Sequence, residues 1–247
     1  MQEDEILAEV VERPRHAYVM LPDTRVIERP GWFQLITPSF TQGGFNDVHA
    51  ELDDANADRV IAETIAEYRD LGVKFRWTVG PDSKPADLAD RLARAGLRRT
   101  DSVGMARATE ITPVSSVAVV RVDATTLDQF TEAMSDGWGR DATPFRIAHR
   151  LMLASDNQHM FLAMCDGECA GAATYVSFPR SAYLLGAVVR EACRGRGVYR
   201  ALVEARLADA AARGVTLATT HAMLETSAPM LARFGFRTVC SLVSFRS

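Results

Sequence analysis

The 247-residue sequence predicts an α/β fold with a mixed sheet, built from two related units. Two observations support this prediction. Strand-like and helix-like patterns alternate along most of the chain, as in folds whose sheets are covered by helices. A segment near the C-terminus also repeats a segment near residue 100, which indicates an internal duplication.

The repeat pairs Leu92–Arg107 with Leu231–Arg246 at a fixed offset of 139 residues, with seven identities in 16 positions. In both copies a short helical pattern ends at a glycine and a strand-like run follows. A polar stretch with a proline at residues 109–116 separates two patterned regions. We therefore expect one domain at 1–112 and a second at 113–247.

The elements of the first half follow from apolar spacing and from the glycines that end each helical pattern. In chain order we expect a helix over 57–70, a strand over 73–79, a helix over 85–95 and a strand ending at 105.

The second half contains a β-branched run, an amphipathic helix, and two strands around Asp166-Gly167, a dipeptide that favours a tight hairpin. An alanine-rich helix and further strands follow. The expected ranges are strands over 117–122, 161–165, 169–176, 183–189, 215–219 and 239–245, with helices over 125–138, from about 198 to 212, and over 228–234.

Composition and charge narrow the class of protein. Apolar residues make up 47% and the net charge is −4, which is typical of a globular chain. The sequence has no basic cluster of the kind that binds nucleic acid, and no apolar run long enough to span a membrane. The N-terminus is acidic where a signal peptide would be basic. We expect a cytoplasmic protein with reduced thiols and no nucleic-acid or membrane partner.

Charge is divided unevenly, with a net −6 over residues 1–110 and +2 over 111–247. The second half therefore suits an anionic ligand better. Cys165 and Cys169 have the spacing of a possible zinc pair, but no second Cys or His pair accompanies them, so we expect no metal.

The segment Arg194-Gly195-Arg196-Gly197-Val198-Tyr199-Arg200 leaves an expected strand and opens an expected helix. Glycines let backbone N–H groups converge, and a helix N-terminus adds partial positive charge at the same place. The arginines attract an anion. These features suit a pyrophosphate, although a plain glycine turn with solvated arginines has the same pattern.

This turn, together with the closing Leu231-Ala232-Arg233-Phe234-Gly235-Phe236, resembles the GNAT superfamily of N-acetyltransferases over residues 117–247. The resemblance implies a tandem GNAT-like fold, with a mostly antiparallel central sheet flanked by helices. It departs from the family pattern at Tyr199, where Gly or Ala is usual. The first half resembles a degenerate copy without a cofactor site, because Glu51, Asp53 and Asp54 would repel a pyrophosphate.

The resemblance also implies acetyl-CoA as co-substrate. Its pyrophosphate would lie on the turn 194–200, and the main chain of Ala187, Val188 and Val189 would hold the pantetheine and the thioester. A buried strand with no ligand would have the same apolar pattern, so the pattern alone does not distinguish a cofactor-binding strand from a structural one.

The candidates for proton transfer are Tyr183, His221 and Glu225. Tyr183 occupies the position of a glutamate in some family members and could orient the acceptor. His221 has an ordinary pKa near neutral pH and Glu225 follows the same strand. Leu231 stands where the family usually has a tyrosine acid.

The acceptor is expected over residues 137–146, where Trp138 and Phe145 could form a wall and Asp141 could anchor an amine. A simple helix-to-helix connection is the alternative. We expect an acyltransferase that moves an acetyl group directly to a primary amine of a small molecule or peptide. The alternative is a non-catalytic acyl-CoA-binding sensor or regulatory module.

Overall fold

A computed structural model describes residues 1–247, which form two compact units. The first unit contains residues 1–105 and 221–247, and the second contains residues 106–220. The sequence predicted ranges 1–112 and 113–247 instead. The division differs because contacts group the C-terminal segment with the first unit.

The first unit contains most of its secondary structure in its N-terminal segment and receives three further elements, in whole or in part, from the C-terminal segment. Its elements are α1 (Glu3–Val11), the 3-10 helix η1 (Arg13–His16), β1 (Arg25–Arg29), β2 (Trp32–Ile36), β3 (Asp47–Ala50), α2 (Ala57–Asp70), β4 (Arg76–Val79), α3 (Leu88–Arg94), most of β5 (Arg98–Ala108), the end of β10 (Leu217–Met223), α7 (Ser227–Ala232) and β11 (Arg237–Arg246).

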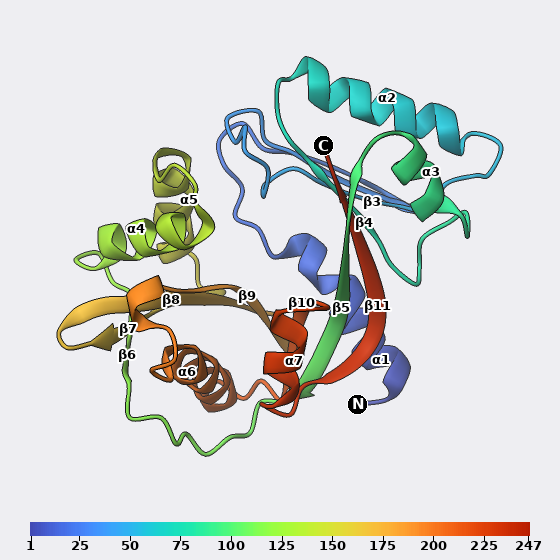
Figure 1. The fold of residues 1–247 in the computed structure, drawn as a ribbon. Coiled ribbons are helices and arrows are strands. Elements are labelled where there is room, and N and C mark those ends of the chain that lie inside the picture. Colours follow the sequence, from blue (N-terminus) through green and yellow to red (C-terminus); the bar gives the residue numbers. More distant parts are fainter. The chain divides into compact units, whose positions relative to one another are not determined.

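Its strands lie in the order β1-β2-β3-β4-β11-β5. The β1–β2, β2–β3 and β4–β11 pairs are antiparallel, and the β3–β4 pair is parallel. Helices α2 and α3 lie on one side of these strands and α1 on the other (Figure 1). The core between α2, α3 and the strands includes Ile61, Tyr68, Trp77, Leu92 and Phe245.

The second unit contains β6 (Ala118–Arg121), α4 (Leu127–Trp138), α5 (Thr143–Leu153), β7 (Gln158–Cys165), β8 (Glu168–Ser177), β9 (Ser181–Val189), the 3-10 helix η2 (Glu191–Cys193), α6 (Val198–Ala212) and the start of β10. Its strands follow the order β10-β9-β8-β7-β6. All neighbouring pairs are antiparallel except the parallel pair β9–β10. Helix α6 covers one side and α4 and α5 the other (Figure 1). The expected mixed, mostly antiparallel sheet flanked by helices is confirmed.

The internal repeat is visible in the positions of the elements. Helices α3 and α7 begin at Leu88 and Ser227, and strands β5 and β11 begin at Arg98 and Arg237, so both pairs keep the offset of 139 residues. The glycines that end the two helices, at 96 and 235, have φ of 87° and 81°. That left-handed backbone explains why both copies require glycine there.

The last strand of the second copy lies in the first unit. Strand β11 occupies the position next to β4, with pairs from Val243↔Val79 to Arg246↔Arg76. Strand β5, the last of the first copy, is on the other side of β11. We call β11 the exchanged strand, because the repeat would place β5 beside β4 (Figure 1).

The elements before residue 57 were not expected from the sequence, whereas the helix over 57–70 matches α2 at both ends. Residues 139–142 join α4 to α5, which is the helix-to-helix connection given as the alternative for 137–146. No helix in the structure is both long enough and apolar enough to cross a membrane.

Candidate functional site

The turn between β9 and α6 has the backbone that its sequence predicts. Gly195 and Gly197 have φ of 75° and 79°, a left-handed conformation that other residues rarely adopt. A Cβ at either position would meet no atom within 4 Å, so the space above both glycines is open. Helix α6 then begins at Val198.

Four consecutive amides of this turn are free to bind a ligand. The N–H groups of Gly195, Arg196, Gly197 and Val198 donate no hydrogen bond within the protein. They lie at the N-terminus of a 15-residue helix, where the aligned peptide dipoles add partial positive charge. The chemistry of these donors fits a pyrophosphate group, which offers many anionic acceptors.

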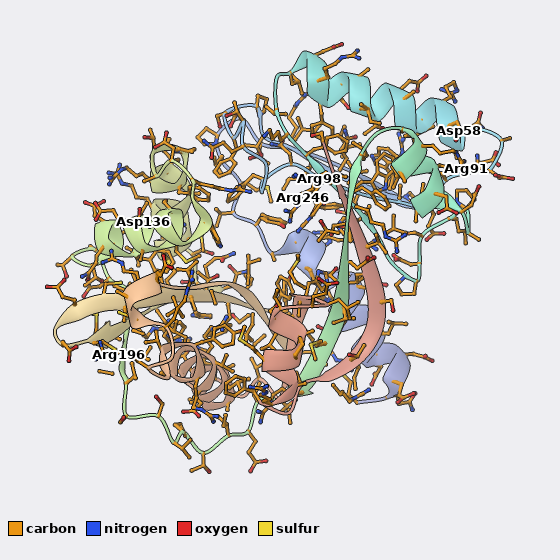
Figure 2. All side chains as sticks on the ribbon, in the orientation of Figure 1. Asp58, Arg91, Arg98, Asp136, Arg196 and Arg246 are labelled. Atoms are coloured by element: carbon orange, nitrogen blue, oxygen red, sulfur yellow. The ribbon has the colours of Figure 1, made fainter.

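Two arginines of the turn pair with exposed carboxylates. The Arg196 guanidinium donates to Asp166 at 2.8 Å, and Arg194 lies 3.9 Å from Glu191. Asp166 belongs to the β7–β8 hairpin turn, and Figure 2 shows Arg196 beside that hairpin. Exposed ion pairs are weak, so a bound phosphate could replace these carboxylates. The sequence did not indicate Asp166 as part of this site, because the pairing depends on the hairpin's position.

Arg200 is held differently, by a carboxylate inside the unit. Its guanidinium lies 3.6 Å from Glu204, one turn along α6. Glu204 is buried and accepts the amides of Val114 and Ser115 at 3.0 and 2.9 Å. This carboxylate therefore fixes the segment before β6 to the helix as well as orienting Arg200.

Strand β9 has an irregular end next to the turn. Its pairing with β8 shifts register around Gly186, whose φ is 60°. Strand β10 pairs only with Ser181–Tyr183. Beyond that point the edge of β9 has no strand partner on the β10 side. The predicted segment Ala187–Val189 lies on this open edge, where its main chain can accept and donate hydrogen bonds.

Trp138 and Phe145, predicted to line the acceptor site, come together in the structure. Their ring centroids are 5.5 Å apart. Trp138 also contacts Gly186, because a Cβ there would lie 3.1 Å from the indole Cζ2. Trp138 is 41% exposed, whereas Phe145 is buried. The aromatic pair thus lies against the irregular end of β9.

Asp141 has a structural partner of its own. Its Oδ1 accepts the Thr143 amide at 3.0 Å and the Thr143 hydroxyl at 2.9 Å, at the start of α5. These hydrogen bonds lower the pKa of Asp141 and keep it ionised. The exposed Asp141 carboxylate therefore holds the start of α5 and keeps its negative charge.

Comparison with known proteins identifies the family of this region. Residues 124–236 match the family model described as "Acetyltransferase (GNAT) family". These residues form a GNAT acetyltransferase domain. The GNAT domain includes the turn at 194–200, continues through α7, and ends before the exchanged strand. No curated protein sequence matched the chain.

Solved structures show the same fold over nearly the whole chain. A conserved protein of unknown function from Staphylococcus epidermidis has a TM-score of 0.70 at 12% identity, covering 92% of this chain and 95% of its own. A GCN5-related N-acetyltransferase from Kribbella flavida has a TM-score of 0.69 at 14% identity, with 99% and 95% covered. A tandem GNAT protein from the clavulanic acid biosynthesis pathway has a TM-score of 0.63 at 14% identity, with 92% and 84% covered. At these identities the likeness shows the fold, and it confirms the tandem arrangement.

The three candidates for proton transfer in the GNAT domain lie in different surroundings. Tyr183 is buried on β9, and the β8 register places its side chain on the same face as Val188. His221 is grouped with the first unit and its Nε2 donates to the Val10 carbonyl at 2.8 Å. Burial lowers its pKa to about 4, so it is neutral at pH 7. Glu225 is exposed in the turn after β10.

The corresponding turn of the first unit, between β3 and α2, is acidic and already paired. Glu51 pairs with Lys84 at 2.9 Å. Arg91 pairs with Asp54 and lies 3.4 Å from Asp58 (Figure 2). The carboxylates here thus bind protein cations, unlike the open glycine turn of the GNAT domain.

The four cysteines are free thiols, including Cys165 and Cys169 at the ends of β7 and β8. The structure has no group of three or more His, Cys, Asp or Glu side chains placed to hold a metal ion.

Proposed function

We propose that this chain is an N-acetyltransferase that moves the acetyl group of acetyl-CoA directly to a primary amine of a small molecule or peptide. The observation that carries the proposal is the row of free amides at residues 195–198, at the start of α6. The GNAT family of the domain supports acetyl transfer in general. The first unit would lack a cofactor site of its own.

In this proposal the pyrophosphate of acetyl-CoA binds the free amides of Gly195, Arg196, Gly197 and Val198, with Tyr199 completing the first turn of α6. Arg194, Arg196 and Arg200 add charge attraction. The open edge of β9 at Ala187, Val188 and Val189 supplies main-chain hydrogen bonds to the pantetheine arm. Acetyl-CoA supplies the activated thioester, and the residues of the chain bind it and orient it.

The acceptor amine would lie against Trp138 and Phe145, with its charge near Asp141. Attack of the neutral amine on the thioester carbonyl forms a C–N bond and breaks the C–S bond, releasing coenzyme A as the thiolate. The proton lost by the amine passes to water or to a protein group. Tyr183 faces the same side as Val188 and would orient the amine. His221 and Glu225 are the two other candidates for the base, and each is tested by substitution with Gln.

Titration calorimetry with acetyl-CoA tests the donor site. We expect binding by the wild type and its loss in the double variant Arg196→Glu/Gly197→Glu, because two carboxylates would enter the turn. Arg237→Glu, at an exposed arginine of β11, is the control and should bind as the wild type does. No binding by the wild type, or unchanged binding by the double variant, contradicts the proposal.

A second candidate function is a non-catalytic acyl-CoA sensor. The observation that favours it is the buried Leu231 of α7, at the position where the family usually has a tyrosine acid. A thiolate of coenzyme A can leave unprotonated near neutral pH, so this loss slows transfer without preventing it. Release of free thiol from acetyl-CoA across a panel of amines distinguishes the two functions, since a sensor binds acetyl-CoA and releases none.

A further inference from the structure

Arg206 of α6 is a buried cation without a carboxylate partner. Its side chain is almost fully enclosed, at 2% exposed. Its Nε donates to the Leu202 carbonyl at 2.9 Å and its Nη1 to the Thr174 carbonyl at 3.1 Å. Burial lowers its pKa to about 10, so it remains protonated at neutral pH. Enclosing an ionised group without a counter-ion is unfavourable, and a structural or functional reason is required.

Two other arginines, one in α6 and one directly after its last residue, have acidic partners. Arg200 lies 3.6 Å from Glu204, and Arg213 lies 2.9 Å from Asp209. Arg206 instead directs its guanidinium at a main-chain carbonyl of β8. The position of Arg206 beside β8, more than the balance of charges on α6, therefore explains why this arginine is buried.

The carbonyl that Arg206 binds lies at the irregularity between β8 and β9. Register pairs run Ala173↔Ala187 and then Thr174↔Leu185, which leaves Gly186 as an extra residue on β9. Such a bulge bends the strand and disturbs its ladder of hydrogen bonds. Here the Thr174 carbonyl accepts from Arg206, and the Thr174 hydroxyl donates to the Leu185 carbonyl. Side-chain donors thus hold both carbonyls beside Gly186.

The bulge determines which part of β9 is open. Strand β10 pairs with β9 only as far as Tyr183, and the segment after Gly186 has no strand partner on that side. This segment is the one proposed to hold the pantetheine arm. A change at Arg206 would therefore reach the donor site through Thr174 and the bulge.

We propose that Arg206 is a positioning residue for the acyl donor: it holds the Gly186 bulge from the α6 side and so fixes the open edge of β9. This inference rests on the proposed function. It requires that Arg206 affect the pantetheine and thioester end of the donor, and leave the pyrophosphate end at residues 195–198 unaffected.

Two ligands separate these ends. Acetyl-CoA would use both the turn and the edge of β9, whereas 3′-phospho-ADP has the pyrophosphate without the pantetheine arm. For Arg206→Met we expect acetyl-CoA to bind about tenfold more weakly, the scale of one hydrogen bond from a charged group. Binding of 3′-phospho-ADP should stay within roughly twofold of the wild type. Arg206→Lys, which keeps the charge and a donor, should restore part of the loss.

Arg213→Met is the control, because it removes an arginine that directly follows the same helix and has an acidic partner, and both ligands should bind this variant normally. Equal weakening of both ligands by Arg206→Met, or no change in either, overturns the inference. If Arg206→Met does not fold, Arg206→Lys decides instead: weaker binding of acetyl-CoA with unchanged binding of 3′-phospho-ADP supports the inference, and equal weakening of both ligands overturns it. A wild type that binds neither ligand instead contradicts the proposed function.

Discussion

Replacing Gly137 with alanine tests how closely α4 packs on β9. A Cβ at this position would lie 2.4 Å from the Val188 Cβ and 2.6 Å from its Cγ1. Non-bonded carbons prefer about 3.5–4.0 Å, so α4 or β9 would have to move by about 1 Å. Overpacking of this kind costs about 1–3 kcal/mol. Helix propensity alone would give the opposite sign, a gain of about 1 kcal/mol for Gly→Ala.

The expected result is therefore a net loss of up to about 2 kcal/mol in the free energy of unfolding, measured by urea denaturation followed by circular dichroism. Val188 belongs to the segment proposed to hold the acyl donor, so the rate of thiol release from acetyl-CoA should fall as well. A misplacement of 1 Å can reduce a rate by about a hundredfold.

Val188→Ala provides a partial rescue, because it removes the two Cγ atoms that the new Cβ would meet and leaves the Val188 Cβ in place. In a double-mutant cycle we expect the Gly137→Ala/Val188→Ala protein to be more stable than the sum of the single changes by at least about 1 kcal/mol. Gly139→Ala is the matched control: its φ is 61° and a Cβ there meets no atom within 4 Å. Its cost should be independent of Val188. Additive effects at 137, or stabilisation by Gly137→Ala, would refute the argument.

Three further predictions concern charge, pH and the exchanged strand. Asp166→Asn removes the carboxylate that pairs with a turn arginine, so acetyl-CoA should bind roughly two- to fivefold more tightly in calorimetry at low salt, and unchanged affinity would contradict this. Burial lowers the pKa of His149, His159 and His221 to about 4, below the unfolded value near 6.5. Their contribution to stability is therefore complete above pH 6.5 and is lost as the pH falls toward 4. Constant urea midpoints between pH 7 and 4.5 would disprove this prediction. Phe245→Ala in the exchanged strand should lower the free energy of unfolding by about 3–5 kcal/mol, measured by urea denaturation followed by tryptophan fluorescence. A loss below about 1 kcal/mol would show that the strand is dispensable.

The sequence predicted those features that depend on neighbours along the chain. The turn at 194–200, the hairpin at Asp166-Gly167 and the helix over 57–70 have local patterns, and the structure contains all three. The repeat was also recognisable, because its helices and strands kept the same spacing in both copies. The roles of the individual residues of the turn remain predictions.

The features that the sequence did not predict depend on contacts between distant segments. Strand β2 is buried throughout and β1 is exposed throughout, so neither shows the alternation of a strand with one buried face. The pairing of Asp166 with Arg196 requires the hairpin and the turn to be placed together. The sequence also does not distinguish β5 from β11 as the partner of β4, because the two strands descend from the same repeat.

The exchanged strand determines when the first unit can finish folding. Strand β4 is synthesised before the second unit, yet its partner β11 follows that unit in the chain. During synthesis the edge of β4 stays unpaired while the whole second half is translated, and native contacts of such long sequence separation form slowly. An unpaired edge favours aggregation, so chains terminated before β11 should be recognised and degraded more readily than chains that contain it. Completion of the N-terminal core is thereby coupled to synthesis of the whole second unit.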